Sequence, residues 1–275
     1  DAMASVTDES RRHPLRTYPL LEQGTLRADI VACMAAAPYD VIFAPPFGGS
    51  EIMEIMASLR FAAPVFDSLE YFRKFDPLTY RHMLTVFSLT VMIAHRLVPG
   101  YQDRVSEIAY GPTHDFGKIS VPLPVLTKDA PLTREEQEQL RHHSVAGFVL
   151  LSHYFGSSEV TAARVSLDHH ERADGSGYPR GVRQTDALVN IVSVCDIYDA
   201  LISCRPYRRF CYDNRTALEE LTLMARRGEI GWQAVRMLIL CNRKSKTVGL
   251  DFPVSKEVRG TPPPGNLYGK LEEEG

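Results

Sequence analysis

The sequence predicts a mainly α-helical protein with a small α/β unit at its N-terminus. Between residues 68 and 245, apolar stretches with helical spacing follow one another, separated by turn-forming residues such as Pro99 and Gly100. A capping box formed by Thr133 and Glu136 marks the start of one of these helices. Residues 1–67 contain a strand-like run, Asp40–Ala44.

Residues 1–67 make up the expected α/β unit. The pattern predicts a helix over Thr25–Ala36, the strand-like run Asp40–Ala44, a turn at Pro45–Gly49, and a helix that opens at Ser50. These residue types indicate no chemistry. The function of the unit is therefore unknown, and a regulatory role is one hypothesis.

Residues 68–245 are expected to form one helical domain. Its helices are predicted at Leu78–Leu97, Asp103–Gly111, Thr133 to about Tyr154, Ser158–Glu171, Asp186–Ser203, Asn214–Arg227 and Trp232–Arg243. The β-branched middle of Asp186–Ser203 would also suit a strand, but its length and the spacing of Asp196 and Asp199 favour a helix. Residues 246–275 are expected to form an irregular tail.

Composition narrows the class of protein. The 275 residues are 44% hydrophobic and 24% charged, which is an ordinary balance for a globular chain. A net charge of −3 provides no basic field, so we expect no DNA or RNA partner and only local phosphate recognition. The sequence contains no run of about 18 apolar residues, and it therefore predicts no membrane span. Five cysteines, without a Cys-x-x-Cys pair, favour a reduced, cytoplasmic protein in which most of them are small core residues.

The run His169–Pro179 carries the strongest chemical signal. Neighbouring residues of a helix point about 100° apart, so two adjacent histidines that converge need a metal or an anion between them. A second signal, His114-Asp115-Phe116-Gly117-Lys118, stands upstream. Together the two motifs indicate a metal-dependent hydrolase.

The candidate ligands are histidines and aspartates in largely apolar helical surroundings. Buried carboxylates are rare without a cation, because removing their charge from water is costly. A His/Asp set without thiolates suits iron, or alternatively manganese, better than structural zinc. Two divalent ions balanced by two carboxylates leave charge for a bridging hydroxide and a phosphodiester. The candidate ligands are His82, His114, Asp115, His143, His169, His170 and Asp196.

Other residues suit substrate binding. Lys118 follows Asp115 by three positions, so it should face the same cleft and contact a phosphate oxygen or protonate a leaving alkoxide. Gly177 allows close backbone approach, and Tyr178 can stack on a base or bind a phosphate. The two arginines in Arg205-Pro206-Tyr207-Arg208 can clamp a phosphate.

These motifs closely resemble the HD-GYP family, a branch of the HD superfamily of metal-dependent phosphohydrolases. The matches are His114-Asp115, the signature His169–Pro179, Asp196–Leu201 and Arg205–Arg208, and they extend over roughly residues 70–245. The resemblance implies an HD-superfamily helical bundle that hydrolyses cyclic di-GMP to pGpG or GMP. It also implies diguanylate cyclase (GGDEF) domains as partners of the signature loop.

The resemblance also implies how the residues divide. One metal is matched by His82, His114, Asp115 and Asp196, and the other by bridging Asp115 with His143, His169 and His170. His142 competes with His143, but the following Ser144 and Gly147 favour His143. Lys118 matches the family's catalytic-region lysine, and Arg205 and Arg208 match phosphate contacts.

The chain departs from the family pattern at one position, and several alternative functions stay open. Some family members hold a third metal with a glutamate where this chain has Leu78, so we expect two metals. The alternatives are a weakly active module that binds cyclic dinucleotides and signals through partners, and a di-iron oxygenase on the same helical core. The substrate choice between cyclic di-GMP and cyclic GMP–AMP, and the oligomeric state, are not indicated.

Overall fold

A computed structural model describes residues 16–46, 48–98, 111–204, 210–243 and 252–263 of the chain. The predicted helix Asp103–Gly111 and the predicted phosphate contacts Arg205 and Arg208 lie outside these residues, apart from Gly111, which begins the short 3-10 helix η3 (Gly111–Thr113). The fold is mainly α-helical, as predicted. None of the described helices is long and apolar enough to cross a membrane.

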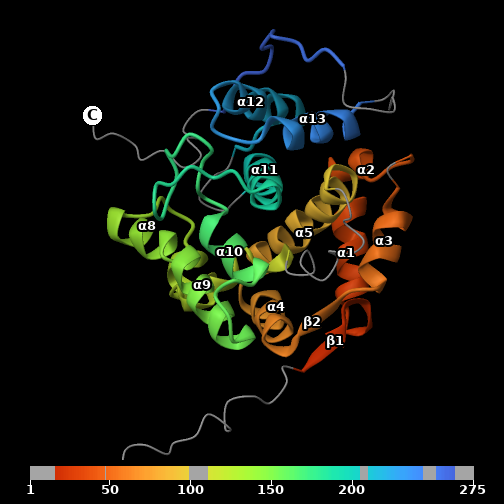
Figure 1. Cartoon of the computed structure of the whole chain (residues 1–275). Helices are drawn as coiled ribbons and strands as arrows, with labels where there is room; N and C mark the ends of the chain where they lie inside the picture. The colour runs from red at the N-terminus through yellow and green to blue at the C-terminus, as the bar shows by residue number, and fades with distance from the viewer. Residues whose placement is uncertain (1–15, 47, 99–110, 205–209, 244–251, 264–275) are drawn as a thin grey trace, which may run out of the picture.

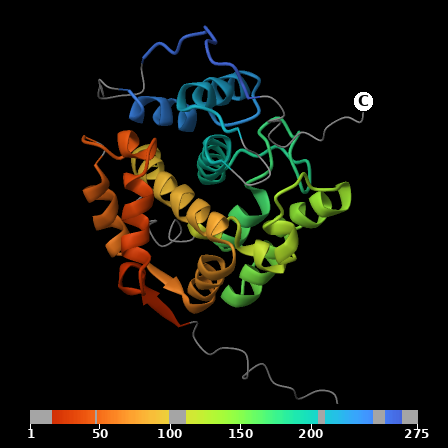
Figure 2. The same cartoon turned by 180° about the vertical axis from the view of Figure 1, so that it is seen from behind.

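The helix α5 (Pro77–Leu97) forms the centre of the fold. Figures 1 and 2 show it crossing the middle of the molecule. Pro77 takes the first helical position, where no backbone donor is needed, and the Asp76 side chain caps the helix by accepting from Thr79 N. Most of its residues from Thr79 to Ala94 are buried, because other helices pack on several sides. A helix buried on several sides holds any polar residue it carries inside the protein.

The other long buried helix is α11 (Ala187–Ile202), which packs against α5 and is capped by Asp186. The helices α12 (Asn214–Arg226) and α13 (Trp232–Cys241) pair with each other and cover α11. On another side lie α8 (Arg134–Arg141), α9 (His143–Phe155) and α10 (Thr161–Asp168), with the short helices η4 (Phe116–Ser120) and α7 (Leu123–Leu126) nearby.

Two predicted boundaries differ in detail. The helix expected from Thr133 to Tyr154 begins with the predicted capping box but divides at His142 into α8 and α9. The reason is burial: no residue of α8 is buried, whereas α9 must face the core through Gly147 and Leu151. The helix expected over Ser158–Glu171 is shorter, because Asp168 ends α10 just before the double histidine.

The N-terminal segment contains β1 (Thr17–Pro19), η2 (Leu20–Glu22), α1 (Leu26–Ala35), α2 (Tyr39–Ile42), α3 (Gly49–Ala57), β2 (Arg60–Ala62) and α4 (Ala63–Phe75). Its two strands pair antiparallel, with Thr17 opposite Ala62. The strand expected at Asp40–Ala44 is wrong: the first residues of this run belong to α2. Tyr39 and Ile42 are both buried, and Phe43 N donates to Tyr39 O, so burial follows the helical and not the strand period.

One hydrophobic core joins the N-terminal segment to the helices. Ile30 and Phe61 from the segment belong to the same buried cluster as Phe87, Tyr198 and Leu238. The division of the chain near residue 67 therefore stays a prediction about function. In the fold, the N-terminal helices pack directly on α5.

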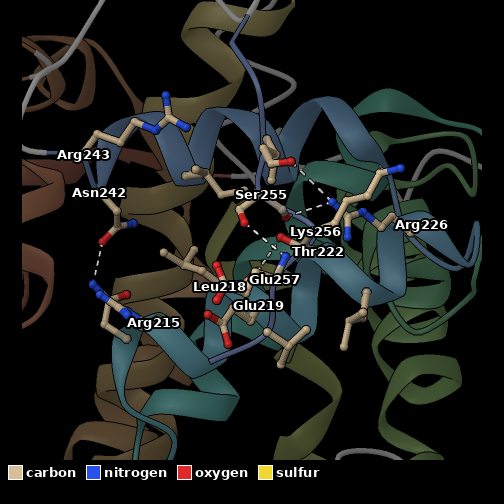
Figure 3. A pocket seen from close by; sticks show the side chains of 15 residues that line it. Arg215, Leu218, Glu219, Thr222, Arg226, Asn242, Arg243, Ser255, Lys256 and Glu257 are labelled. Carbon is tan, nitrogen blue, oxygen red and sulfur yellow. Dashed lines mark hydrogen bonds between the residues drawn. The ribbon is translucent and has the colours of Figure 1, made fainter. Parts of the chain in front are cut away.

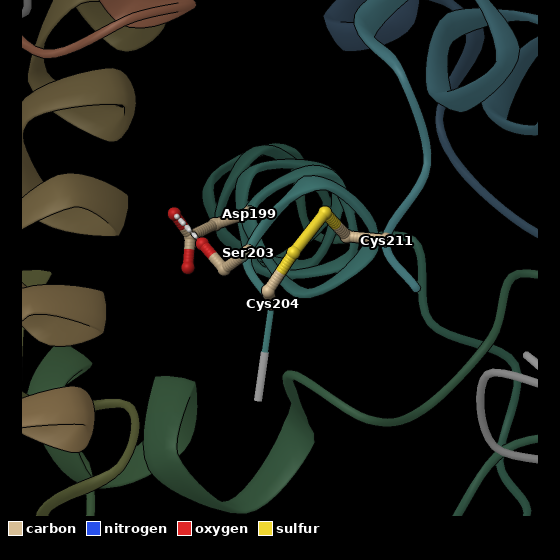
Figure 4. Close-up of a disulfide and its surroundings, with 4 residues drawn as sticks. All are labelled: Asp199, Ser203, Cys204 and Cys211. Atoms are coloured by element: carbon tan, nitrogen blue, oxygen red, sulfur yellow. Dashed lines mark hydrogen bonds between the residues drawn. A yellow bond between two sulfur atoms is a disulfide. The ribbon is translucent and has the colours of Figure 1, made fainter. Parts of the chain in front are cut away.

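The cysteines differ in part from expectation. Cys33, Cys195 and Cys241 are buried thiols, as expected. Cys204 and Cys211, however, form a disulfide at the end of α11, so the expectation of fully reduced cysteines is wrong for this pair (Figure 4). The chain returns beside the helix end, where Tyr212 N donates to Leu201 O, and this brings the two Cα atoms to 5.1 Å.

The C-terminal residues 252–263 contain no helix or strand, and part of this segment lies along α12 and α13. Arginines hold it by donating to its carbonyls, for example Arg236 to Phe252 O and Arg226 to Ser255 O. A cavity of about 470 Å³ lies between this segment and the two helices (Figure 3). The cavity shares no residue with the predicted metal ligands.

Candidate metal centre

Five separate parts of the chain bring the predicted ligands together. His82 comes from α5, and His114 and Asp115 come from the turn between η3 and η4. His143 begins α9, and Asp196 lies in the middle of α11. The double histidine directly follows α10. The cluster consists of His82, His114, Asp115, His143, His169, His170 and Asp196, and all but the half-buried His170 are buried.

One group of ligand atoms gathers around His82. Its Nε2 lies 3.4 Å from His114 Nε2, 3.4 Å from Asp115 Oδ2 and 3.1 Å from Asp196 Oδ1. Nitrogen and carboxylate oxygen atoms that converge in this way can surround a single ion.

A second group consists of His143, His169 and His170. The Nε2 atoms of His143 and His169 lie 3.3 Å apart, and one nitrogen of each of the three rings lies within 4.8 Å of the others. The adjacent histidines do converge, with ring centroids 4.0 Å apart, because α10 has ended and the chain turns between them. This is the arrangement that the sequence motif predicted.

Asp115 lies between the two groups. Its Oδ2 is 3.4 Å from His82 Nε2 and 3.5 Å from His114 Nε2, whereas its Oδ1 is 3.4 Å from His143 Nε2. Each carboxylate oxygen therefore faces one group of histidines. Asp196 is similarly placed, with Oδ1 beside His82 and Oδ2 3.9 Å from His170 Nδ1.

Hydrogen bonds on the outer side of the rings fix their orientation. His82 Nδ1 lies 2.6 Å from Asp199 Oδ2, His143 Nδ1 2.5 Å from Leu140 O, and His169 Nδ1 2.9 Å from Ser166 O. Each acceptor requires a hydrogen on Nδ1, so Nε2 is the nitrogen of each ring that is directed into the cluster. Partners of this kind set the tautomer of metal-ligating histidines.

The electrostatics also suit cations. Burial lowers the pKa of both His143 and His169 to about 4, so these rings are neutral at pH 7 and available as ligands. Burial also acts to lower the pKa of His82, but its hydrogen bonds to Asp196 and Asp199 outweigh burial and raise the pKa to about 9. Metal binding at His82 therefore has to displace a proton at neutral pH.

Lys118 lies beside the cluster, as predicted. Its Nζ is 2.5 Å from Asp115 Oδ2. Burial acts to raise the pKa of Asp115, but the charge of Lys118 and the neighbouring histidines outweigh it and hold that pKa well below its usual range. The carboxylate is therefore ionised at any physiological pH.

Glycines bring the supporting segments unusually close. A Cβ on Gly117 would lie 1.9 Å from His143 O, so only glycine lets η4 touch α9 here. A Cβ on Gly177 would lie 2.4 Å from His170 O, so glycine lets this loop pack closely on the double histidine, and the role of Gly177 in substrate binding stays a prediction. The buried Glu171 completes this loop by accepting from Arg180 N and Val182 N at 2.7 and 3.1 Å.

Tyr178 stands next to the second group. Its ring stacks on His170 with centroids 4.5 Å apart, and the Arg141 guanidinium lies 4.4 Å from the Tyr178 centroid. Stacking on a nucleobase stays a prediction. Sequence reasoning missed Arg141, and it missed Tyr39, which donates to Asp199. Tyr39 lies far from Asp199 in the sequence, so no sequence pattern could have indicated this contact.

A family model described as an HD domain matches residues 92–231. The chain belongs to the HD domain family, in its HD-GYP branch. A "Cyclic di-GMP phosphodiesterase" of Thermotoga maritima is 40% identical over 137 residues, which cover 48% of this chain and 37% of that protein. "Cyclic di-GMP phosphodiesterase PA4108" of Pseudomonas aeruginosa is 35% identical over 212 residues, covering 75% and 48%.

Another relative is the "3'3'-cGAMP-specific phosphodiesterase 1" of Vibrio cholerae, 32% identical over 159 residues, covering 57% of this chain and 35% of that protein. The chain spans less than half the length of these relatives. Among solved structures, Bd1817, an HDG"Y"P protein from Bdellovibrio bacteriovorus, aligns with a TM-score of 0.49 and 16% identity, covering 78% of this chain and 76% of that one.

Proposed function

We propose that this HD-GYP protein is a metal-dependent phosphodiesterase that hydrolyses cyclic di-GMP. The observation that carries the proposal is the position of Asp115, whose two oxygens face two separate histidine groups. A carboxylate between two nitrogen-rich groups suits two metal ions held close together, as in two-metal hydrolases. The activities for which the relatives are named support cyclic dinucleotides as the substrate class.

Two divalent ions fit these residues, with iron as the first choice and manganese as the alternative. His82, His114, Asp115 and Asp196 would hold one, and Asp115, His143, His169 and His170 the other. When bound, such ions lower the pKa of a water molecule and neutralise charge on a phosphodiester. The donor set has no thiolate and no exposed carboxylate, which is consistent with ions that take part in chemistry.

The protein's own groups would orient the substrate. Lys118 provides an ammonium group beside Asp115, where it can neutralise a phosphate oxygen and give a proton to the departing 3′ oxygen. Gly177 and Tyr178 form the rim of the second group, and Arg205 and Arg208 would contact phosphate. Cleavage of one diester yields pGpG, and cleavage of both yields GMP.

Several wider expectations belong to the same proposal. We propose a cytoplasmic enzyme with a catalytic domain over residues 68–245, an N-terminal unit that modulates it, and GGDEF domains as partners of the loop around Tyr178. Cyclic GMP–AMP is the second substrate candidate, because several Vibrio cholerae relatives are named for it.

The test starts with protein purified without oxygen and analysed for metals. About two first-row ions per chain are expected, together with release of pGpG or GMP from cyclic di-GMP. Asp115→Ala should lose both the ions and the turnover. Cyclic GMP–AMP, assayed in parallel, decides the substrate. Metal binding with tight nucleotide binding but no product would instead favour a signalling module.

A further inference from the structure

Tyr39 connects the N-terminal segment to the metal centre. It lies in α2, and its hydroxyl donates a hydrogen bond to Oδ1 of Asp199 on α11. The other oxygen of the same carboxylate, Oδ2, lies 2.6 Å from His82 Nδ1. Tyr39, Asp199 and His82 are 5%, 2% and 4% exposed, so water does not compete for these hydrogen bonds. The result is a buried hydrogen-bonded chain from α2 to the cluster.

The direction of each hydrogen bond follows from its chemistry. An ionised carboxylate only accepts, so both the Tyr39 hydroxyl and His82 Nδ1 donate to Asp199. A hydrogen on Nδ1 leaves Nε2 as the coordinating atom. His82 Nε2 is the atom that points at the cluster, 3.1 Å from Asp196 Oδ1. The orientation of Asp199 therefore decides which nitrogen of His82 can bind a metal.

We propose that Tyr39 is a positioning residue of the metal centre, which holds Asp199 and through it fixes the ring plane and the tautomer of His82. The inference rests on the proposed metal site. It deepens that proposal because it makes a residue of the N-terminal segment part of the centre. Movement of α2 would then change the affinity of one metal position without any contact with substrate.

The expected size of the effect follows from what else holds Asp199. Ser203 Oγ also donates to Asp199 Oδ1, at 3.2 Å. This longer bond comes from the next turn of the same helix and anchors the carboxylate only in part. Loss of a hydrogen-bonding partner behind a metal ligand typically weakens metal affinity by about 10–100-fold. With Ser203 still present, we expect the lower limit, about tenfold.

Tyr39→Phe in the full chain removes the hydroxyl and keeps the ring, which packs edge-on against Tyr198 with centroids 6.3 Å apart. Tyr80→Phe is the matched control, because the Tyr80 hydroxyl also donates to a carboxylate, Asp29 Oδ2 at 2.8 Å, but that carboxylate belongs to α1 and faces no ligand. Calorimetric titration of metal-free protein with Mn²⁺ measures affinity and stoichiometry.

Tyr39→Phe should bind one ion about tenfold more weakly, while Tyr80→Phe stays within about twofold of wild type. Equal affinities for Tyr39→Phe and wild type would overturn the inference, and so would an equal loss in both variants. In an Asp199→Asn background, Tyr39→Phe should cause no further loss; an additive loss would mean that Tyr39 acts elsewhere. If wild type itself binds no metal, the proposed function fails as a whole, together with the coupling of Tyr39 to His82 through Asp199.

Discussion

The pH dependence of stability in the metal-free protein tests the electrostatics of the cluster. His143 and His169 have folded-state pKa values of about 4, whereas an unperturbed histidine titrates near 6.5. The unfolded chain therefore binds more protons between these values, and stability must fall as pH drops from about 6.5 towards 4. His82 behaves oppositely. Because its folded-state pKa is about 9, His82 makes its full contribution to the free energy of unfolding below about pH 6.5 and loses that contribution as the pH rises towards 9.

The magnitudes are large enough to measure. One pKa unit corresponds to about 1.4 kcal/mol, so each of these buried rings contributes on the order of 3 kcal/mol, and coupling between neighbours reduces the sum. Stability should therefore peak near pH 6.5. It should decline by about 3 kcal/mol on the alkaline side and by more on the acid side, because burial lowers the pKa of His114 and His170 as well as that of His143 and His169.

Urea unfolding of chelator-treated protein, followed by circular dichroism between pH 4.5 and 9, measures this profile. Manganese-loaded protein is the control, because coordinated nitrogens cannot take up protons and the acid decline should move to lower pH. Constant stability between pH 6.5 and 9, or an increase across that range, would refute the hydrogen bonding assigned to His82.

Three further outcomes are expected. His143→Gln should lower the bound metal by about one ion per chain and leave the other, as elemental analysis would show; loss of both or neither contradicts separate positions. Gly117→Ala should destabilise the fold by about 3 kcal/mol or more in urea, since the backbone of α9 blocks the new Cβ, whereas Gly228→Ala meets nothing and should cost only its φ strain. Lys118→Met should lower the free energy of unfolding of metal-free protein by about 3 kcal/mol, because it leaves Asp115 without its ammonium partner. Metal-loaded protein should lose much less, and equal losses in both forms would contradict the assigned pairing of Lys118 with Asp115.

The sequence was sufficient to pick out the residues that the fold gathers into one cluster, because each motif is local; that they bind metal stays a prediction. The double histidine, the His-Asp pair and Asp196 were all recognisable from short spacings, and the structure gathers them as expected. His143 could be separated from His142 only by its neighbours. Its burial, against the exposed His142, agrees with that choice.

Sequence reasoning failed where the outcome depends on contacts between distant segments. The Asp40–Ala44 run has the residues of a strand, but Tyr39 and Ile42 are both buried and belong to one helical turn. The contact of Tyr39 with Asp199 is equally invisible from spacing. The pairing of Cys204 with Cys211 depends on the chain returning past Leu201, and no local sequence pattern predicts that return.

The cluster also explains how the protein tolerates two buried aspartates before any metal binds. Asp115 has Lys118 at 2.5 Å, and Asp196 has the protonated His82 at 3.1 Å, so each of these two ligand carboxylates has a positive neighbour; His82 also contacts the buried Asp199, at 2.6 Å. Buried charges of this kind are stable only when they are paired. A divalent ion would face the same carboxylate oxygens as the Lys118 ammonium and the protonated His82, and its charge would take over their role of neutralising the two carboxylates. Metal binding should therefore release a proton from His82 and free the ammonium of Lys118 from Asp115, which would make Lys118 available to a phosphate only when the centre is loaded.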